Sequence, residues 1–209
     1  MKYRILTILA AVLGLIAPTR AMQYAGADIS MLPLYEQIGA RYNDCDGNPL
    51  PDNDVIKWYA AQGMNTMRVR LFVDPSKQLE SNYKYDNGNI VVDRQDGLSG
   101  KPDQNVCQTK EYILPICRRI KQAGMKLILD FHYSDYWADP TKQWTPVEWR
   151  GLSDDQLYQK IYDYTKETLQ WFKDRGVVPD MIQTGNEISW GMLWGTPNSG
   201  TLHRTANWG

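Results

Sequence analysis

The residues best suited to chemistry are Asn186 and Glu187, an amide and a carboxylate side by side where an apolar, extended segment ends. That segment begins at Met181, after a Gly-Val-Val-Pro turn that closes a helix-like stretch. A carboxylate at the carboxyl end of a parallel strand lies where α/β barrels keep their reactive groups, so Glu187 is a candidate proton donor. The alternative is a helix start, because Asn or Ser followed by Glu is also a capping signal.

Polar or ionisable side chains also end the other predicted strands. The full set is Asp28, then Arg68 and Arg70, then Asp130 and His132, then Asn186 and Glu187. In an open sheet only the strands at a switch point need such ends, whereas every strand tip of a closed barrel faces one centre. Two alternatives stay open at this stage. Arg68 could form a structural ion pair with an aspartate, and His132 could be a buried, hydrogen-bonded histidine instead of a substrate contact.

A repeating unit of helix, glycine and apolar strand must position these side chains. Helices are predicted over 54–62, 110–123 and 154–175, and strands over 24–29, 65–73, 125–131 and 181–187. Residues 74 to about 107 are predicted to form one long polar loop. Alternating strands and helices indicate a parallel sheet with right-handed crossovers. The predicted fold class is therefore α/β, a (β/α)8 TIM barrel. Residues 22–209 would form about its first four strands, the N-terminal part of one catalytic domain.

The first 21 residues have the pattern of a signal peptide. Lys2 and Arg4 precede an apolar run over 5–16, and Thr19-Arg20-Ala21 is a small-residue cleavage pattern. The run is shorter than the roughly 20 residues that span a bilayer, so we expect a secreted, periplasmic or cell-surface protein without stable membrane insertion. Without the leader the chain is mildly acidic, which argues against nucleic acid and suits a neutral polymer.

Three cysteines, Cys45, Cys107 and Cys117, allow one disulfide or none in an exported chain, and their pairing stays open. We expect no cofactor, no metal and a monomeric protein. Six of the eight tryptophans fall in predicted loops after the third and fourth strands. They are Trp137, Trp144, Trp149, Trp190, Trp194 and Trp208. About half of them are expected to stack on sugar rings and half to pack the loops together, because aromatic side chains serve both roles.

Four motifs together resemble the arabinogalactan endo-β-1,4-galactanases, glycoside hydrolase family 53. They are GADIS at 26–30, RVR at 68–70, LDFHYSDYWADP at 129–140 and GNE at 185–187. The resemblance runs from about residue 24 to the end, and the motif at 129–140 is its most specific part. It implies a (β/α)8 barrel and retaining hydrolysis of β-1,4-galactan, the side chains of pectin.

The resemblance also implies roles for individual residues. Glu187 matches the acid/base glutamate on strand four, and the nucleophilic glutamate of strand seven would lie beyond residue 209. The expected substrate-binding residues are Asp28, Arg70, His132 and Asn186, which match positions around the innermost sugar subsite, together with Trp137. The 209-residue chain by itself is expected to be inactive.

Two other functions remain open from the sequence. One is a related barrel glycosidase acting on another β-1,4 polysaccharide such as mannan, xylan or β-glucan. The other is a non-catalytic product, either a glycan-binding remnant or a fragment that misfolds, because a half-barrel leaves two strand edges bare.

Overall fold

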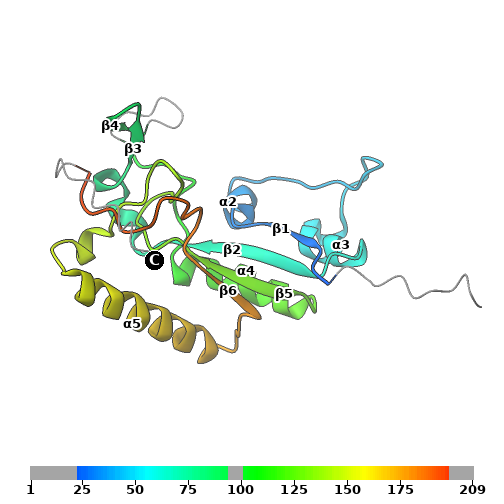
Figure 1. Ribbon diagram of the computed structural model, residues 1–209. Helices are drawn as coiled ribbons and strands as arrows, with labels where there is room; N and C mark the ends of the chain where they lie inside the picture. The colour runs from blue at the N-terminus through cyan, green and yellow to red at the C-terminus, as the bar shows by residue number, and fades with distance from the viewer. Residues whose placement is uncertain (1–22, 94–100, 198–209) are drawn as a thin grey trace, which may run out of the picture.

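A four-stranded parallel sheet with helices along it forms the centre of the computed structural model, which describes residues 23–93 and 101–197 (Figure 1). The predicted signal peptide and Trp208 lie outside the described residues. The sheet strands are β1 (Gly26–Asp28), β2 (Thr66–Leu71), β5 (Lys126–Phe131) and β6 (Met181–Thr184). Their spatial order, β1-β2-β5-β6, follows their order in the chain without a reversal. A doubly wound sheet would reverse its order at a switch point, so the predicted barrel topology is confirmed.

The two faces of the sheet differ in polarity because side chains alternate along each strand. Met67, Val69 and Leu71 of β2 are fully buried, together with Leu127 and Leu129 of β5. These side chains pack in one core with apolar residues of the flanking helices. The opposite face carries the charged side chains, which places them on the side that a closed barrel turns towards its axis.

The three predicted helices form near their expected bounds, as α3 (Val55–Ala61), α4 (Lys110–Gln122) and α5 (Asp154–Lys173). A short helix, α2 (Leu32–Gln37), precedes them, and the 3-10 turns are η1 (Pro51–Asn53), η2 (Pro75–Glu80) and η3 (Val147–Trp149). The start of α5 is fixed by a capping box between Ser153 and Gln156. Gly124 follows α4 with a φ of 74°, the left-handed stop that the sequence predicts. The short helix α2 was not predicted, because its six residues contain less than two turns of periodic pattern.

The prediction of a structureless loop over 74–107 is wrong. This stretch contains η2 and an antiparallel hairpin of β3 (Tyr83–Asp86) and β4 (Asn89–Val92). Asn87 and Gly88 form the turn with φ values of 47° and 91°, as the tight hairpin turn requires. The Asn-Gly pair was the available signal. It was missed because the flanking strands are only four residues long.

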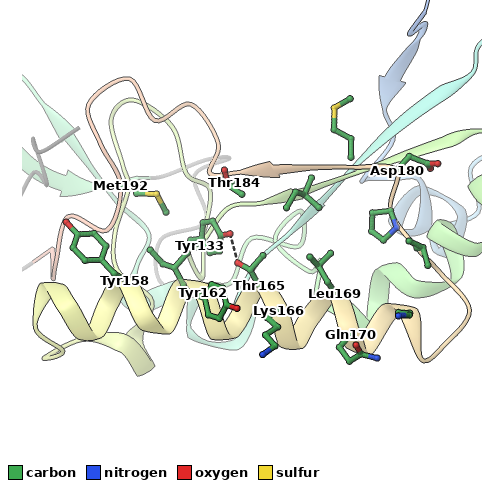
Figure 2. Close-up of a pocket in the computed structure, with 16 residues that line it drawn as sticks. Tyr133, Tyr158, Tyr162, Thr165, Lys166, Leu169, Gln170, Asp180, Thr184 and Met192 are labelled. Carbon is green, nitrogen blue, oxygen red and sulfur yellow. Dashed lines mark hydrogen bonds between the residues drawn. The ribbon is translucent and has the colours of Figure 1, made fainter. Parts of the chain in front are cut away.

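An open groove of about 950 Å³ runs between α5 and β6 (Figure 2). Among the described residues no strand pairs with the outer edge of β6, and Val178, Met181 and Ile182 are exposed there. A closed barrel would pair its next strand at this edge. In the described ranges no helix has the length and apolar character needed to cross a bilayer. The three cysteines are unpaired thiols, and Cys117 is buried on the inner face of α4.

Candidate active site

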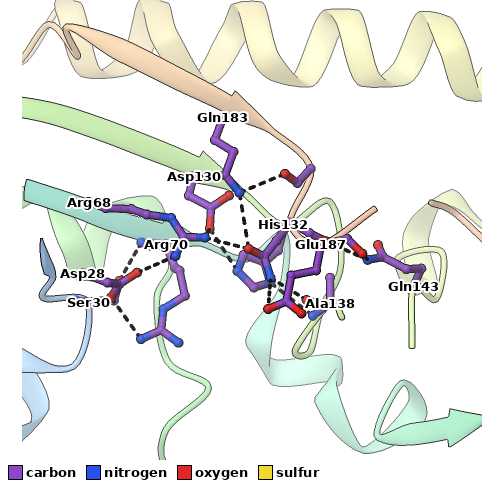
Figure 3. Close-up of polar contacts among 12 residues, drawn as sticks. Asp28, Ser30, Arg68, Arg70, Asp130, His132, Ala138, Gln143, Gln183 and Glu187 are labelled. Carbon is purple, nitrogen blue, oxygen red and sulfur yellow. Dashed lines mark hydrogen bonds and ion pairs between the residues drawn. The ribbon is translucent and has the colours of Figure 1, made fainter. Parts of the chain in front are cut away.

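A polar pocket of about 160 Å³ lies where the strands of the sheet end. It is lined by Arg68, Arg70, His132, Trp137, Ala138, Asp139, Asn186 and Glu187. Five of the six residues predicted to form the site therefore meet in one place, although they come from three different strands and the loops that follow them. The sixth, Asp28, lies beside the pocket and reaches it through ion pairs (Figure 3).

Arg68 lies at the centre of a charged network that joins all four strands. Its Nη1 donates to Asp28 Oδ2 at 3.0 Å, and its Nη2 donates to both Asp130 Oδ2 and Asn186 Oδ1, the latter at 2.6 Å. The Asp130 side chain is fully buried, so it needs the cation next to it to offset the cost of desolvation. Arg68 therefore forms structural ion pairs with two aspartates, which is one of the alternatives left open by the sequence.

Arg70 lies two residues further along β2, on the same face as Arg68, and three contacts hold it. Its Nη2 is 3.2 Å from Asp28 Oδ1, and its backbone N–H donates to Ser30 Oγ at 2.8 Å. Its guanidinium lies 4.4 Å from the centre of the Trp137 ring, a cation–π contact. The indole N–H of Trp137 in turn donates to Asp103 Oδ2 at 3.2 Å. Trp137 is therefore a fixed, partly exposed aromatic wall of the pocket.

His132 is buried beneath the pocket, with 1% of its surface exposed. Its Nδ1 accepts a hydrogen bond from the Ala138 backbone N–H at 3.1 Å, so the neutral ring carries its proton on Nε2. Nε2 lies 3.2 Å from Asp130 Oδ2, without good hydrogen-bond alignment. Burial lowers the pKa of His132, against the opposing pull of Asp130, and Arg68 and Arg70 lower it further. His132 is accordingly neutral at pH 7.

The lowered pKa of His132 predicts a pH dependence of stability. Below its ordinary pKa of about 6.5, the unfolded chain binds a proton that the folded state excludes. The free energy of unfolding should therefore fall as the pH drops below that value, by at most about 1.4 kcal/mol per pH unit from this group. Urea unfolding at pH 7.0 and pH 5.5, with His132→Asn as the comparison, measures the contribution. Equal pH slopes for the two proteins would contradict it.

Asn186 and Glu187 follow β6 in a tight turn, not in a helix, so the capping alternative is wrong. The Asn186 amide is anchored through both of its polar atoms: its Oδ1 accepts from Arg68, and its Nδ2 donates to the Ala138 carbonyl at 2.7 Å. Glu187 adopts a left-handed φ of 50°, and its side chain is exposed at the pocket. Asn186 Nδ2 lies 3.5 Å from Glu187 Oε1. An anchored amide thus adjoins an accessible carboxylate.

Several buried polar atoms in this cluster have no hydrogen-bond partner within the described part of the chain. They are Arg68 Nε, Arg70 Nε, Asp130 Oδ1 and His132 Nε2. Unsatisfied buried polar groups are costly and rare in ordinary cores. Their concentration at one pocket indicates a site arranged for function instead of for maximal stability.

The described loop tryptophans differ in burial. Trp144, Trp149 and Trp194 are buried at 1%, 1% and 0% exposure and pack the loops together. Trp190 is 60% exposed, and Trp137 lines the pocket. Burial and exposure of an indole depend on how the loops fold over one another, which the sequence positions alone do not determine.

Sequence reasoning missed two polar residues, one that lines the pocket and one that lies behind it. Asp139 lines it directly, and it stood unassigned within the motif at 129–140. Gln143 is buried and contacts the turn that carries Glu187, but a single glutamine in a long loop gives no pattern to detect.

The fold and the site define the chain as part of a (β/α)8 barrel with its polar pocket at the carboxyl ends of the strands, where such barrels place their active sites. The profile of Glycosyl hydrolase family 53 matches residues 24–209. The chain belongs to this family, and the resemblance found in the sequence is confirmed.

Relatives with known names agree with this assignment. The chain is 34% identical over 181 residues to the probable arabinogalactan endo-beta-1,4-galactanase A of Neosartorya fischeri, which covers 86% of this chain and 42% of that protein. It is 34% identical over 188 residues to the arabinogalactan endo-beta-1,4-galactanase of Humicola insolens. That match covers 90% of this chain and 45% of the relative. The chain therefore spans somewhat less than half the length of these relatives.

Solved structures show the same fold. A fungal beta-1,4-galactanase superposes with a TM-score of 0.63 at 31% identity, covering 86% of this chain and 45% of that one. The GH53 catalytic domain of Ignisphaera aggregans superposes with a TM-score of 0.68 at 29% identity. The superposition covers 92% of this chain and 46% of that domain.

Proposed function

We propose that residues 22–209 are the N-terminal half of an exported endo-β-1,4-galactanase, which hydrolyses the β-1,4-galactosidic bonds of galactan and arabinogalactan. The family and the names of the similar proteins support the substrate class. The observation that carries the proposal is the place of Glu187. It is an accessible carboxylate at the end of β6, in one pocket with Arg70, His132 and Asn186.

The proposed reaction is a double displacement with retention of configuration. A second carboxylate, on a later strand of the barrel outside residues 1–209, attacks the anomeric carbon. The bond from that carbon to the bridging O4 breaks, and Glu187 gives its proton to O4 of the departing chain. In the second step Glu187 takes a proton from water, whose oxygen displaces the enzyme carboxylate and releases the sugar. The two carboxyl groups of such a pair lie about 5–5.5 Å apart.

The other pocket residues are proposed to bind the sugar at the reacting centre. Trp137 offers an indole face held by Arg70, and indole faces stack on the C–H faces of sugar rings. Asn186 is fixed by Arg68 and Ala138, and its Nδ2 lies 3.5 Å from Glu187 Oε1, beside the reacting carboxylate. Asp28 and His132 act behind them, Asp28 by orienting both arginines and His132 by packing neutral against Asp130. Preorganised support of this kind is what an active site requires.

A substrate panel tests the proposed function. The protein tested is the complete barrel, in which residues 22–209 are joined to the second half. We expect it to release reducing sugar from β-1,4-galactan at least about tenfold faster than from β-1,4-mannan, xylan or glucan, because a sugar of different configuration or size loses transition-state contacts. Faster release from any of these three polymers would contradict the proposed substrate.

A further inference from the structure

The turn that carries Glu187 has a backbone conformation that needs support from outside the turn. A left-handed φ in a residue other than glycine costs about 1–2 kcal/mol, and Glu187 has a φ of 50°. Gly185, two residues earlier, is held by a hydrogen bond from its N–H to the Phe131 carbonyl at 2.9 Å. That bond ends the β6 ladder. Inside the turn the Ser189 N–H donates to the Glu187 carbonyl at 2.9 Å, whereas the Asn186 carbonyl is contacted from outside the turn.

Gln143 makes that contact from the loop between β5 and α5. Its side-chain Nε2 donates to the Asn186 carbonyl at 2.6 Å and lies 3.4 Å from the Glu187 carbonyl (Figure 3). Gln143 is only 2% exposed, and its backbone carbonyl accepts a hydrogen bond from the Trp194 backbone N–H at 2.7 Å. The side-chain amide therefore bridges the carbonyls of Asn186 and Glu187, while the Gln143 backbone is itself held by Trp194.

Loop packing alone does not explain this contact. Thr145 already joins the same two loops: its N–H donates to the Gly195 carbonyl at 3.1 Å, and its Oγ1 accepts from the Gly195 N–H at 3.0 Å. Those bonds do not touch the turn at Glu187. Gln143 places a separate pair of contacts on the two carbonyls that flank the Glu187 N–Cα bond, the bond whose rotation is φ.

We infer that Gln143 is a positioning residue for proton transfer by Glu187. It holds the backbone of the acid in its left-handed conformation, and so keeps the carboxylate aimed at the bridging oxygen of the substrate. The inference rests on the proposed function of Glu187 as the general acid. Gln143 itself does not line the pocket.

The test separates proton transfer from other steps. In the complete barrel, Gln143→Met keeps the length of the side chain and removes both donated contacts. For the polymer the kcat should fall about 10- to 100-fold with KM within about twofold, because a misplaced acid costs rate and not binding. A 2,4-dinitrophenyl β-glycoside of the disaccharide unit of that polymer needs no proton for its leaving group. Its kcat/KM, which reports only the first displacement, should stay within about twofold of wild type.

Two further variants keep the test decisive. Gln143→Glu has the same shape but replaces the donor with a carboxylate, and should give the same contrast if the Met variant folds poorly. Thr145→Val breaks a bond between the same loops, and should leave kcat on the polymer within about twofold of wild type. Equal losses on both substrates, or no loss on the polymer, would overturn the inference. The contrast can be read on whichever β-1,4 glycan the wild type cleaves, so an error in the proposed substrate does not affect it.

Discussion

Replacing Glu187 by Gln is expected to lower the rate of β-1,4-galactan hydrolysis by the complete barrel about 10³-fold. Gln has the shape of Glu but has no proton to give to the bridging oxygen. Glu187 is exposed, and no ion pair of its side chain occurs among the described residues, so the substitution should leave the fold intact. Reducing-sugar release and the thermal unfolding midpoint, measured on the same preparations, check both statements.

The activity loss must be specific to this carboxylate. Glu167, an exposed residue of α5, offers a matched control, since Glu167→Gln makes the same chemical change away from the pocket. That variant should keep wild-type activity within about twofold, as surface substitutions usually do. A Glu187→Gln protein that kept a tenth of the wild-type rate would show that another group donates the proton.

Replacing Arg68 by Met is expected to lower the free energy of unfolding by about 3 kcal/mol. The change removes the cation from the fully buried Asp130 and leaves that carboxylate without compensation for its desolvation. It also removes the donor that fixes the Asn186 amide. Urea unfolding of the wild type and the variant measures the difference, and the loss should be much larger than for an ordinary surface arginine.

Two comparisons define the cause of that loss. Arg41→Met removes an exposed arginine and should change stability by no more than about 0.5 kcal/mol. The double variant Arg68→Met with Asp130→Asn should recover part of the stability, because the buried carboxylate is then neutral. If the double variant is as unstable as the sum of the two single variants, the ion pair is not the source of the effect.

The sequence by itself determined the scaffold of this protein. Met67, Val69 and Leu71 alternate with Arg68 and Arg70, and this local period places the apolar side chains against the helices and the arginines on the other face. The helix bounds and the glycine stops are likewise local, set by capping and by backbone conformation. Since parallel strands end at one edge, the meeting of their polar tips also followed from the pattern.

Only the tertiary structure decided how the side chains of the site are connected. Arg68 bonds to Asp130 and not only to its neighbour Asp28, and His132 lies neutral beneath the pocket. Gln143 reaches the turn of Glu187 across 43 or 44 positions of sequence. Such contacts depend on how two long loops fold over each other. Loops have no period that a sequence pattern can expose, so their contacts are fixed by packing and hydrogen bonding in three dimensions.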